Sequence, residues 1–149
     1  MMILCHLKNE TPDTSDYSAA QIDYAETCLI KYFDWEKGHT LQPIYTEVPI
    51  VSEQWRFGGT VDWFGLIDGT ATLLDFKTGK GIYPEMAYQL AAYSHLITEH
   101  NVAPLSHQIL RVGRDDEEGF EIKTFTTLSR QWEIFKHCLA LYRLQRGGY

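Results

Sequence analysis

The pattern of apolar and polar positions predicts a chain in which helices and strands alternate. Apolar residues recur at helical spacing in three stretches: Ser18–Gly38, Pro84 to about His100, and about Ser129 to Gln145. Shorter runs rich in β-branched and aromatic residues predict strands over Leu41–Val51, Arg56–Leu66, Ala71–Phe76, His107–Val112 and Gly119–Phe125. These elements predict a single α/β (α+β) domain over residues 1–149, with a central mixed sheet of about five strands flanked by helices.

Charged residues interrupt this pattern at the third predicted strand. The run Ala71–Phe76 is almost entirely apolar, as in a strand that is buried on both faces, yet it contains Asp75. A buried carboxylate is costly unless it is paired or binds a metal. Because strand side chains alternate between faces, Asp75 and Lys77 should share one face while Phe76 points to the other.

A hairpin turn predicts the partner of Asp75. Asp68-Gly69 between two apolar runs is typical of a two-residue hairpin loop. In that register Asp62 lies opposite Asp75, so two carboxylates meet across neighbouring strands. Their repulsion destabilises the sheet unless a cation lies between them, and hard oxygen ligands suit Mg²⁺ or Mn²⁺.

Three motifs in the middle of the chain resemble those of a nuclease superfamily. They are Gly59-Thr60-Val61-Asp62 (G-x-x-D), Asp75-Phe76-Lys77-Thr78 (D-x-K-T) and Gln89-Leu90-Ala91-Ala92-Tyr93 (Q-x-x-x-Y). In this order, and on these element types, they resemble the PD-(D/E)xK nucleases and, more narrowly, their RecB-like exonuclease branch. The resemblance implies a restriction-endonuclease-like core and hydrolysis of DNA phosphodiester bonds with Mg²⁺ or Mn²⁺.

The resemblance also implies roles for individual residues. Asp62 and Asp75 would ligate the metal, with the Phe76 carbonyl as a third ligand. Lys77 would orient the attacking water or stabilise the developing negative charge. Gln89 and Tyr93, spaced i and i+4 on one helix face, would brace these residues or contact the DNA backbone.

Five further residues are candidates at the margin of this site. The resemblance implies that His6 completes the metal shell and that Glu47 supplies a third carboxylate. The alternatives are a structural or exposed histidine and an exposed strand acid. Thr78 and Lys80 lie in or beside a glycine-containing loop, and they are candidates to contact phosphate together with Arg56.

The charge balance does not favour a non-specific DNA-binding protein. The chain has a net charge of −7, whereas such proteins usually present a basic face. Between Lys8 and Lys37 there are seven acidic and three basic residues, a local charge of −4, which is over half of the excess. Arg111 and Arg114 add to the bases near the candidate site, so a locally basic groove remains compatible with the composition.

Cysteine spacing and hydropathy exclude other classes. The three cysteines are far apart and form no C-x-x-C pair, so we expect no iron–sulfur cluster. No apolar run approaches the roughly 20 residues of a membrane span. The N-terminal segment lacks the features of a signal peptide, so we expect a cytoplasmic protein of a bacterial or phage-infected host cell.

Three functional hypotheses follow from the sequence. The first is a metal-dependent deoxyribonuclease, most simply an exonuclease in recombination or repair, with DNA as substrate and a homo-oligomer or a recombination protein as partner. The second is a catalytically weak nucleic-acid-binding or partner-binding module on the same fold. The third is a metal-dependent hydrolase of a smaller phosphate ester. The sequence leaves open exonuclease against endonuclease, DNA against RNA, and polarity.

Overall fold

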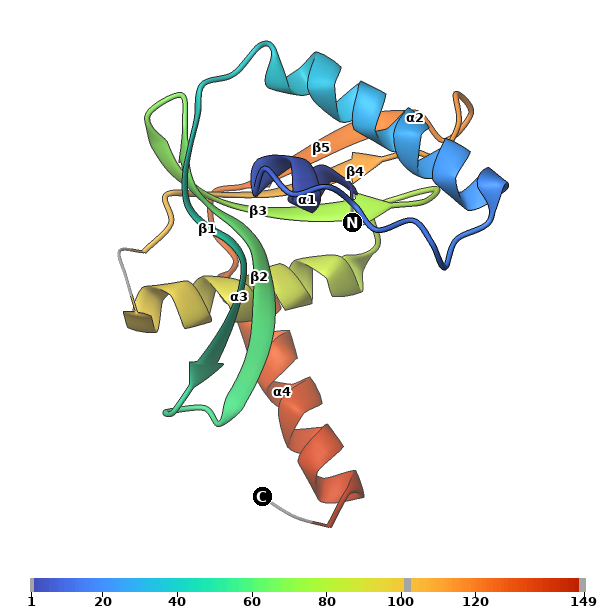
Figure 1. The fold of residues 1–149 in the computed structure, drawn as a ribbon. Coiled ribbons are helices and arrows are strands. Elements are labelled where there is room, and N and C mark those ends of the chain that lie inside the picture. Colours follow the sequence, from blue (N-terminus) through green and yellow to red (C-terminus); the bar gives the residue numbers. More distant parts are fainter. Residues whose placement is uncertain (1, 101–102, 148–149) are drawn as a thin grey trace.

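The computed structural model describes residues 2–100 and 103–147, which form four helices and five strands (Figure 1). In chain order they are α1 (Met2–Leu7), α2 (Ala19–Glu36), β1 (Leu41–Ser52), β2 (Phe57–Ile67), β3 (Thr70–Thr78), α3 (Pro84–His100), β4 (Ser106–Val112), β5 (Phe120–Phe125) and α4 (Ser129–Gln145). The five predicted strands and the three longer helices are confirmed within a few residues. The short helix α1 is additional to the predicted elements.

The five strands form one mixed sheet in the order β1-β2-β3-β4-β5. The first three are antiparallel, β3 and β4 run parallel on either side of the α3 crossover, and β5 returns antiparallel to β4. A crossover helix is the usual connection between parallel neighbours. The predicted α/β domain with a mixed sheet is therefore confirmed.

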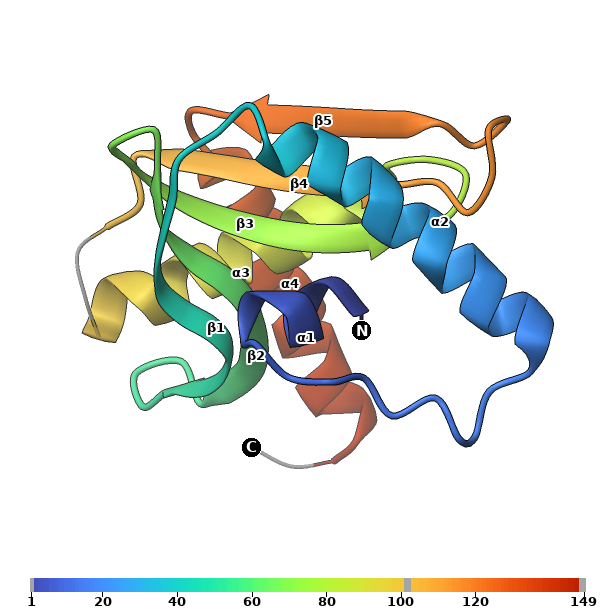
Figure 2. The same ribbon diagram turned by 45° about the horizontal axis from the view of Figure 1, so that its top comes forward.

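Helices cover both faces of the sheet and bury two separate apolar clusters (Figure 2). On one face, side chains of α1 and α2 such as Ile3 and Tyr32 pack against Trp63 and Leu74. On the other face, α3 and α4 pack against strand residues such as Leu73. Within residues 2–100 and 103–147 no helix is both long and apolar enough to cross a membrane.

Turn chemistry sets the register of β2 and β3 as the sequence predicts. Asp68 and Gly69 both have positive φ, 50° and 82°, the backbone of a type I′ hairpin turn. Ile67 lies opposite Thr70, and the ladder continues as far as Trp63 opposite Leu74. At the next position the two strands separate.

Beyond this point β2 follows β1 alone. The pairing of β1 with β2 continues to the pair Ser52 and Phe57, whereas β3 continues beside β4 to Thr78. The far end of the β1–β2 hairpin therefore projects past the sheet and lies beside α4 (Figure 1). Asp62 and Asp75 are located where the strands part, and this separation creates the site described next.

Candidate active site

Asp75 and Lys77 form an ion pair at the end of β3. Asp75 is only 2 % exposed, and the Lys77 ammonium lies 2.7 Å from its Oδ2. The two side chains share a face of the strand, as the alternation predicts. Phe76, between them, packs with the apolar cluster under α1 and α2 on the other face.

Asp62 substitutes for a missing backbone partner. The backbone N–H of Phe76 donates to Asp62 Oδ2 at 2.9 Å. The β2–β3 ladder ends at Trp63 and Leu74, so no β2 carbonyl accepts the next N–H of β3. The Asp62 carboxylate accepts that hydrogen bond instead. This bond fixes the Asp62 carboxylate against β3, next to Asp75.

Gln89 and Tyr93 extend the ion pair into a chain of hydrogen bonds. Lys77 Nζ donates to Gln89 Oε1 at 2.9 Å, and Gln89 Nε2 donates to Tyr93 Oη at 2.8 Å. The glutamine amide thus holds the lysine on one side and the tyrosine on the other. All three motifs contribute to one connected arrangement.

Gly59 allows this arrangement to close. A Cβ at position 59 would lie 2.6 Å from Cε1 of Tyr93, which is shorter than real contacts of that kind. The tyrosine ring therefore packs directly on the backbone of β2. Glycine suits this position because the Tyr93 ring approaches the backbone closely. The backbone angles at Gly59 are ones that other residues also adopt.

Burial raises the pKa values of the acidic groups in this site. Desolvation raises the pKa of Asp75 to about 6; Lys77 opposes the rise and the neighbouring Asp62 adds to it. Desolvation also raises the pKa of Asp62, against the Phe76 N–H and the Lys77 charge. The pKa of the Tyr93 hydroxyl is raised by burial and by both carboxylates. The carboxylates are thus close enough to influence each other and the tyrosine.

The residues present suit a hard divalent cation. In the described part of the chain, Asp75 Oδ2 is a buried acceptor without a hydrogen-bond partner. The Lys77 ammonium is near it, but this contact is an ion pair without the directionality of a hydrogen bond. Mg²⁺ is commonly held by one or two carboxylates together with waters and substrate phosphates. Asp62 and Asp75 supply the two carboxylates of that donor set, and the Phe76 carbonyl remains a predicted third donor.

His6 and Glu47 are directed to other partners. His6 Nε2 lies 3.1 Å from Glu36 Oε2, and its ring packs edge-on against Phe33. Glu47 lies on β1 between the residues paired with Val61 and Trp63, so it is one strand away from Asp62, but its carboxylate binds Lys8 at 3.0 Å.

No group of three or more His, Cys, Asp or Glu side chains in residues 2–100 and 103–147 is placed to hold a metal ion. Of the five donors predicted from the sequence, the structure therefore brings the Asp62 and Asp75 side chains together and directs His6 and Glu47 elsewhere. Glu36 and Lys8 are the partners that sequence reasoning missed.

The three residues predicted to contact nucleic acid do not converge. Thr78 is exposed and lines a groove against α2, on the face opposite Asp75. Arg56 is exposed at the tip of the β1–β2 hairpin with a φ of 51°. Lys80 is exposed in the loop after β3, where its charge helps to lower the pKa of Glu118.

Arg111 supports the site from the neighbouring strand. It is 5 % exposed and lies opposite Lys77 in the parallel ladder of β3 and β4. Its guanidinium donates to the Gly79 carbonyl at 2.8 Å and also contacts Glu121. Arg111 thereby fixes the loop that follows Lys77. From the sequence, Arg111 was identified only as a basic residue near the candidate site. Its position on a predicted strand was the signal that could have indicated this supporting role.

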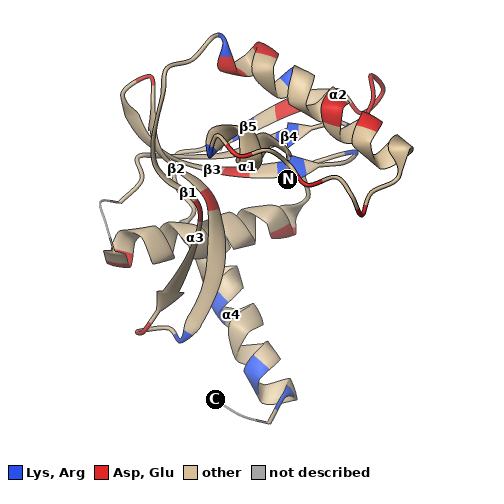
Figure 3. Ribbon diagram, viewed as in Figure 1, with Lys and Arg blue, Asp and Glu red and all other residues tan. Residues whose placement is uncertain are grey.

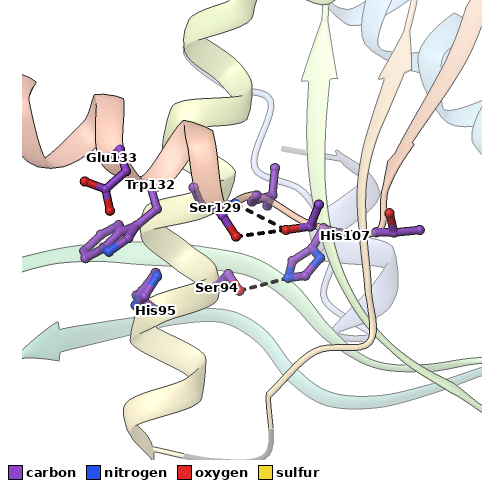
Figure 4. A pocket seen from close by; sticks show the side chains of 10 residues that line it. Ser94, His95, His107, Ser129, Trp132 and Glu133 are labelled. Atoms are coloured by element: carbon purple, nitrogen blue, oxygen red, sulfur yellow. Dashed lines mark hydrogen bonds between the residues drawn. The ribbon is translucent and has the colours of Figure 1, made fainter.

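A second pocket, of about 410 Å³, lies between α3, β4 and the start of α4 (Figure 4). Ser94 Oγ and His107 Nε2 are 2.8 Å apart, and His107 Nδ1 lies 3.4 Å from the Phe125 carbonyl. A histidine protonated on Nδ1 satisfies both contacts. Burial lowers the pKa of His107, so this neutral ring links α3 to the end of β5. Among the described residues the pair has no acidic hydrogen-bond partner, and it is part of the packing.

Comparisons with known proteins define the fold and no family. No protein-family model matches the sequence, and no curated protein matches it. Among solved structures, the chain is similar to a crystal structure from Eubacterium rectale that is described as a "putative exonuclease", with a TM-score of 0.59 and 12 % sequence identity. The likeness covers 99 % of this chain and 66 % of that one, so the present chain spans less than two thirds of its length. The two chains share a fold.

Proposed function

We propose that this chain is a metal-dependent nuclease that hydrolyses DNA phosphodiester bonds at the Asp62–Asp75–Lys77 site. One observation carries the proposal: the buried Asp75 carboxylate and the half-buried Asp62 carboxylate meet where β2 and β3 separate, and burial raises the pKa of both. Buried carboxylates are costly unless cations compensate them, and Lys77 supplies one positive charge to two carboxylates. The shared fold with a protein described as an exonuclease agrees with this assignment.

Each residue of the site has a separate role in the proposed reaction. When bound by Asp62 and Asp75, Mg²⁺ or Mn²⁺ supplies a water of lowered pKa and positive charge near the scissile phosphate. The Lys77 ammonium, held between Asp75 and Gln89, places a fixed cation where negative charge develops in the transition state. Gln89 orients Lys77, and Tyr93 covers the site from the side of β2. Fixed positions matter because small displacements of catalytic groups cost rate.

The finer assignment is an exonuclease acting in recombination or repair. The motif resemblance favours all of it, and the description of the similar protein as a "putative exonuclease" agrees with the exonuclease part alone. The net charge of −7 favours help from a partner protein or from self-association in holding DNA.

The test is a cleavage assay on end-labelled linear DNA and closed circular DNA, with Mg²⁺, with Mn²⁺ and with chelator. We expect metal-dependent loss of linear DNA that Lys77→Ala abolishes. Lys37→Ala is the matched control, because that side chain is 75 % exposed at the C-cap of α2. Cutting of the circle as well would indicate an endonuclease. If Lys77→Ala cuts like the unmodified protein, the site assignment is wrong.

A second candidate is a binding module that keeps the fold and binds metal or nucleic acid without cutting. The observation in its favour is that His6 and Glu47 are held by Glu36 and Lys8, which leaves two carboxylates in the site. This candidate predicts that Mg²⁺ raises the melting temperature while no DNA or RNA is cleaved. Cleavage that depends on Lys77 would exclude it.

A further inference from the structure

A groove of about 490 Å³ opens beside the candidate active site, between the start of β2, the exposed face of α3 and the middle of α4. Its volume lies in the range of small-molecule sites, roughly 300–1,000 Å³. Aromatic rings and glycine backbone dominate its walls, namely Phe57, Gly59, Tyr88, Tyr93 and Phe135. The proposed chemistry does not use this space.

The groove and the site share two residues. Gln89 and Tyr93 line the groove, and the same side chains bind Lys77 and each other through hydrogen bonds. A strand whose phosphate lay at Asp75 and Lys77 would therefore place a neighbouring nucleotide at the mouth of the groove. Continuity with the site identifies the occupant as part of the substrate.

The walls have the chemistry of a base-binding surface. The rings of Phe57 and Phe135 lie 5.0 Å apart on one side, and Tyr88 and Tyr93 project from α3 on the other. The Tyr93 ring packs on the backbone of Gly59 and so forms part of the wall on the side of β2. Unpaired bases stack on aromatic side chains with little regard to sequence.

Charge on α4 complements a nucleic-acid strand. Between Ser129 and Arg146 there are four basic residues and one acidic residue, a local charge of +3 in a chain of −7 (Figure 3). Lys136 lies over the rings of Trp55 and Trp132, and Arg143 donates to the carbonyls of Trp55 and Arg56. The basic helix thus flanks the groove on the side of the hairpin.

We propose that this groove binds an unpaired base of the substrate strand, next to the nucleotide whose phosphate is cut. The inference rests on the proposed nuclease function and names its substrate class: single-stranded DNA or a frayed duplex end. A base within an intact duplex is stacked and paired, so it cannot enter the groove. The chain should therefore bind single strands in preference to blunt duplexes.

Cys138 provides a direct test, because it lines the groove and is exposed, whereas Cys28 is buried. Alkylation of Cys138 by N-ethylmaleimide is followed by mass spectrometry in a Cys5→Ser, Asp75→Asn protein with Mg²⁺, so that bound DNA stays uncut. We expect a saturating oligothymidylate to slow the reaction strongly and a blunt duplex of equal length to leave it nearly unchanged. An unchanged rate with bound single strand, equal protection by the duplex, or no binding of the single strand overturns the inference.

Affinity measurements on two variants provide an independent readout. Tyr88→Ala should weaken oligothymidylate binding about fivefold, the lower end of the range for one base–aromatic stack. Tyr24→Ala, an exposed tyrosine on α2 across the sheet, is the matched control and should bind normally. Cys138→Trp fills the groove from an exposed position and should also weaken binding, with an unchanged melting temperature as the check of folding. Normal binding by both groove variants overturns the inference.

The two proposals fail separately. Metal-dependent cleavage without protection of Cys138 would support the nuclease proposal and overturn the proposed base-binding groove. Protection of Cys138 in an unmodified protein that cleaves no DNA would support a groove that binds single strands and overturn the nuclease proposal.

Discussion

Replacing Asp75 by asparagine should stabilise the metal-free protein, by an amount that grows with pH. The side chain is 2 % exposed, and burial raises its pKa from the ordinary value of 3.8 to about 6. The folded state therefore binds this proton more tightly than the unfolded state. The stabilising contribution of Asp75 is complete below about pH 4 and is lost as the pH rises through 6.

The size of the effect follows from the same values. A pKa that differs by about two pH units between the folded and unfolded states, at about 1.4 kcal/mol per unit, corresponds to about 3 kcal/mol. Asparagine has the shape of the neutral acid and does not ionise. Relative to the unmodified protein, Asp75→Asn should therefore gain about 3 kcal/mol of unfolding free energy between pH 4 and pH 7. For a chain of this size that is roughly 6–12 °C in melting temperature.

The measurement is urea unfolding of both proteins in chelator at pH 4, 5, 6, 7 and 8. Asp23→Asn, at an exposed position on α2, is the matched control for the loss of one carboxylate. A constant difference between Asp75→Asn and the unmodified protein would refute the reasoning. It would mean that Lys77 compensates the buried carboxylate fully without a metal.

Three further outcomes are expected. Mg²⁺ or Mn²⁺ should raise the melting temperature of the unmodified protein at pH 8 and have little effect on Asp75→Asn, as followed by differential scanning fluorimetry; equal shifts in both would place the ion elsewhere. Gly59→Ala should lose about 1–3 kcal/mol of stability and most cleavage activity, because its Cβ would meet the Tyr93 ring at 2.6 Å, whereas Gly38→Ala, with 3.6 Å to its nearest contact, should be well tolerated. His6→Ala should keep the Mg²⁺-induced rise in melting temperature, since Glu36 holds that imidazole; loss of the rise would make His6 a ligand.

Local rules explain how much of the site could be predicted. The Asp68-Gly69 turn sets the β2–β3 register that brings Asp62 toward Asp75, and strand alternation places Lys77 beside Asp75. The i, i+4 spacing of Gln89 and Tyr93 on α3 puts them on one face. The same alternation rule also places Thr78 on the Phe76 face, so its distance from the carboxylates follows from the sequence.

Long-range pairing explains what the sequence did not predict. His6 binds Glu36 across 30 residues and Lys8 binds Glu47 across 39 residues, and neither pair has a local signal. The separation of β2 from β3 after Trp63 and Leu74 is also a tertiary effect, because it depends on β2 following β1 past the end of the sheet. Propensity and periodicity describe single helices and strands, so they do not predict long-range side-chain pairs or the point at which two strands separate.

The edge strand β1 limits how this protein can assemble. Pro43 and Pro49 are exposed and lack an N–H, the register shifts between Pro43 and Tyr45, and Glu47 has a φ of 53°. An edge interrupted in this way is a poor template for another strand, which protects against aggregation through sheet extension. If copies of the chain associate, we therefore expect them to meet through side-chain surfaces or through the short strand β5, and not by continuing the sheet at β1.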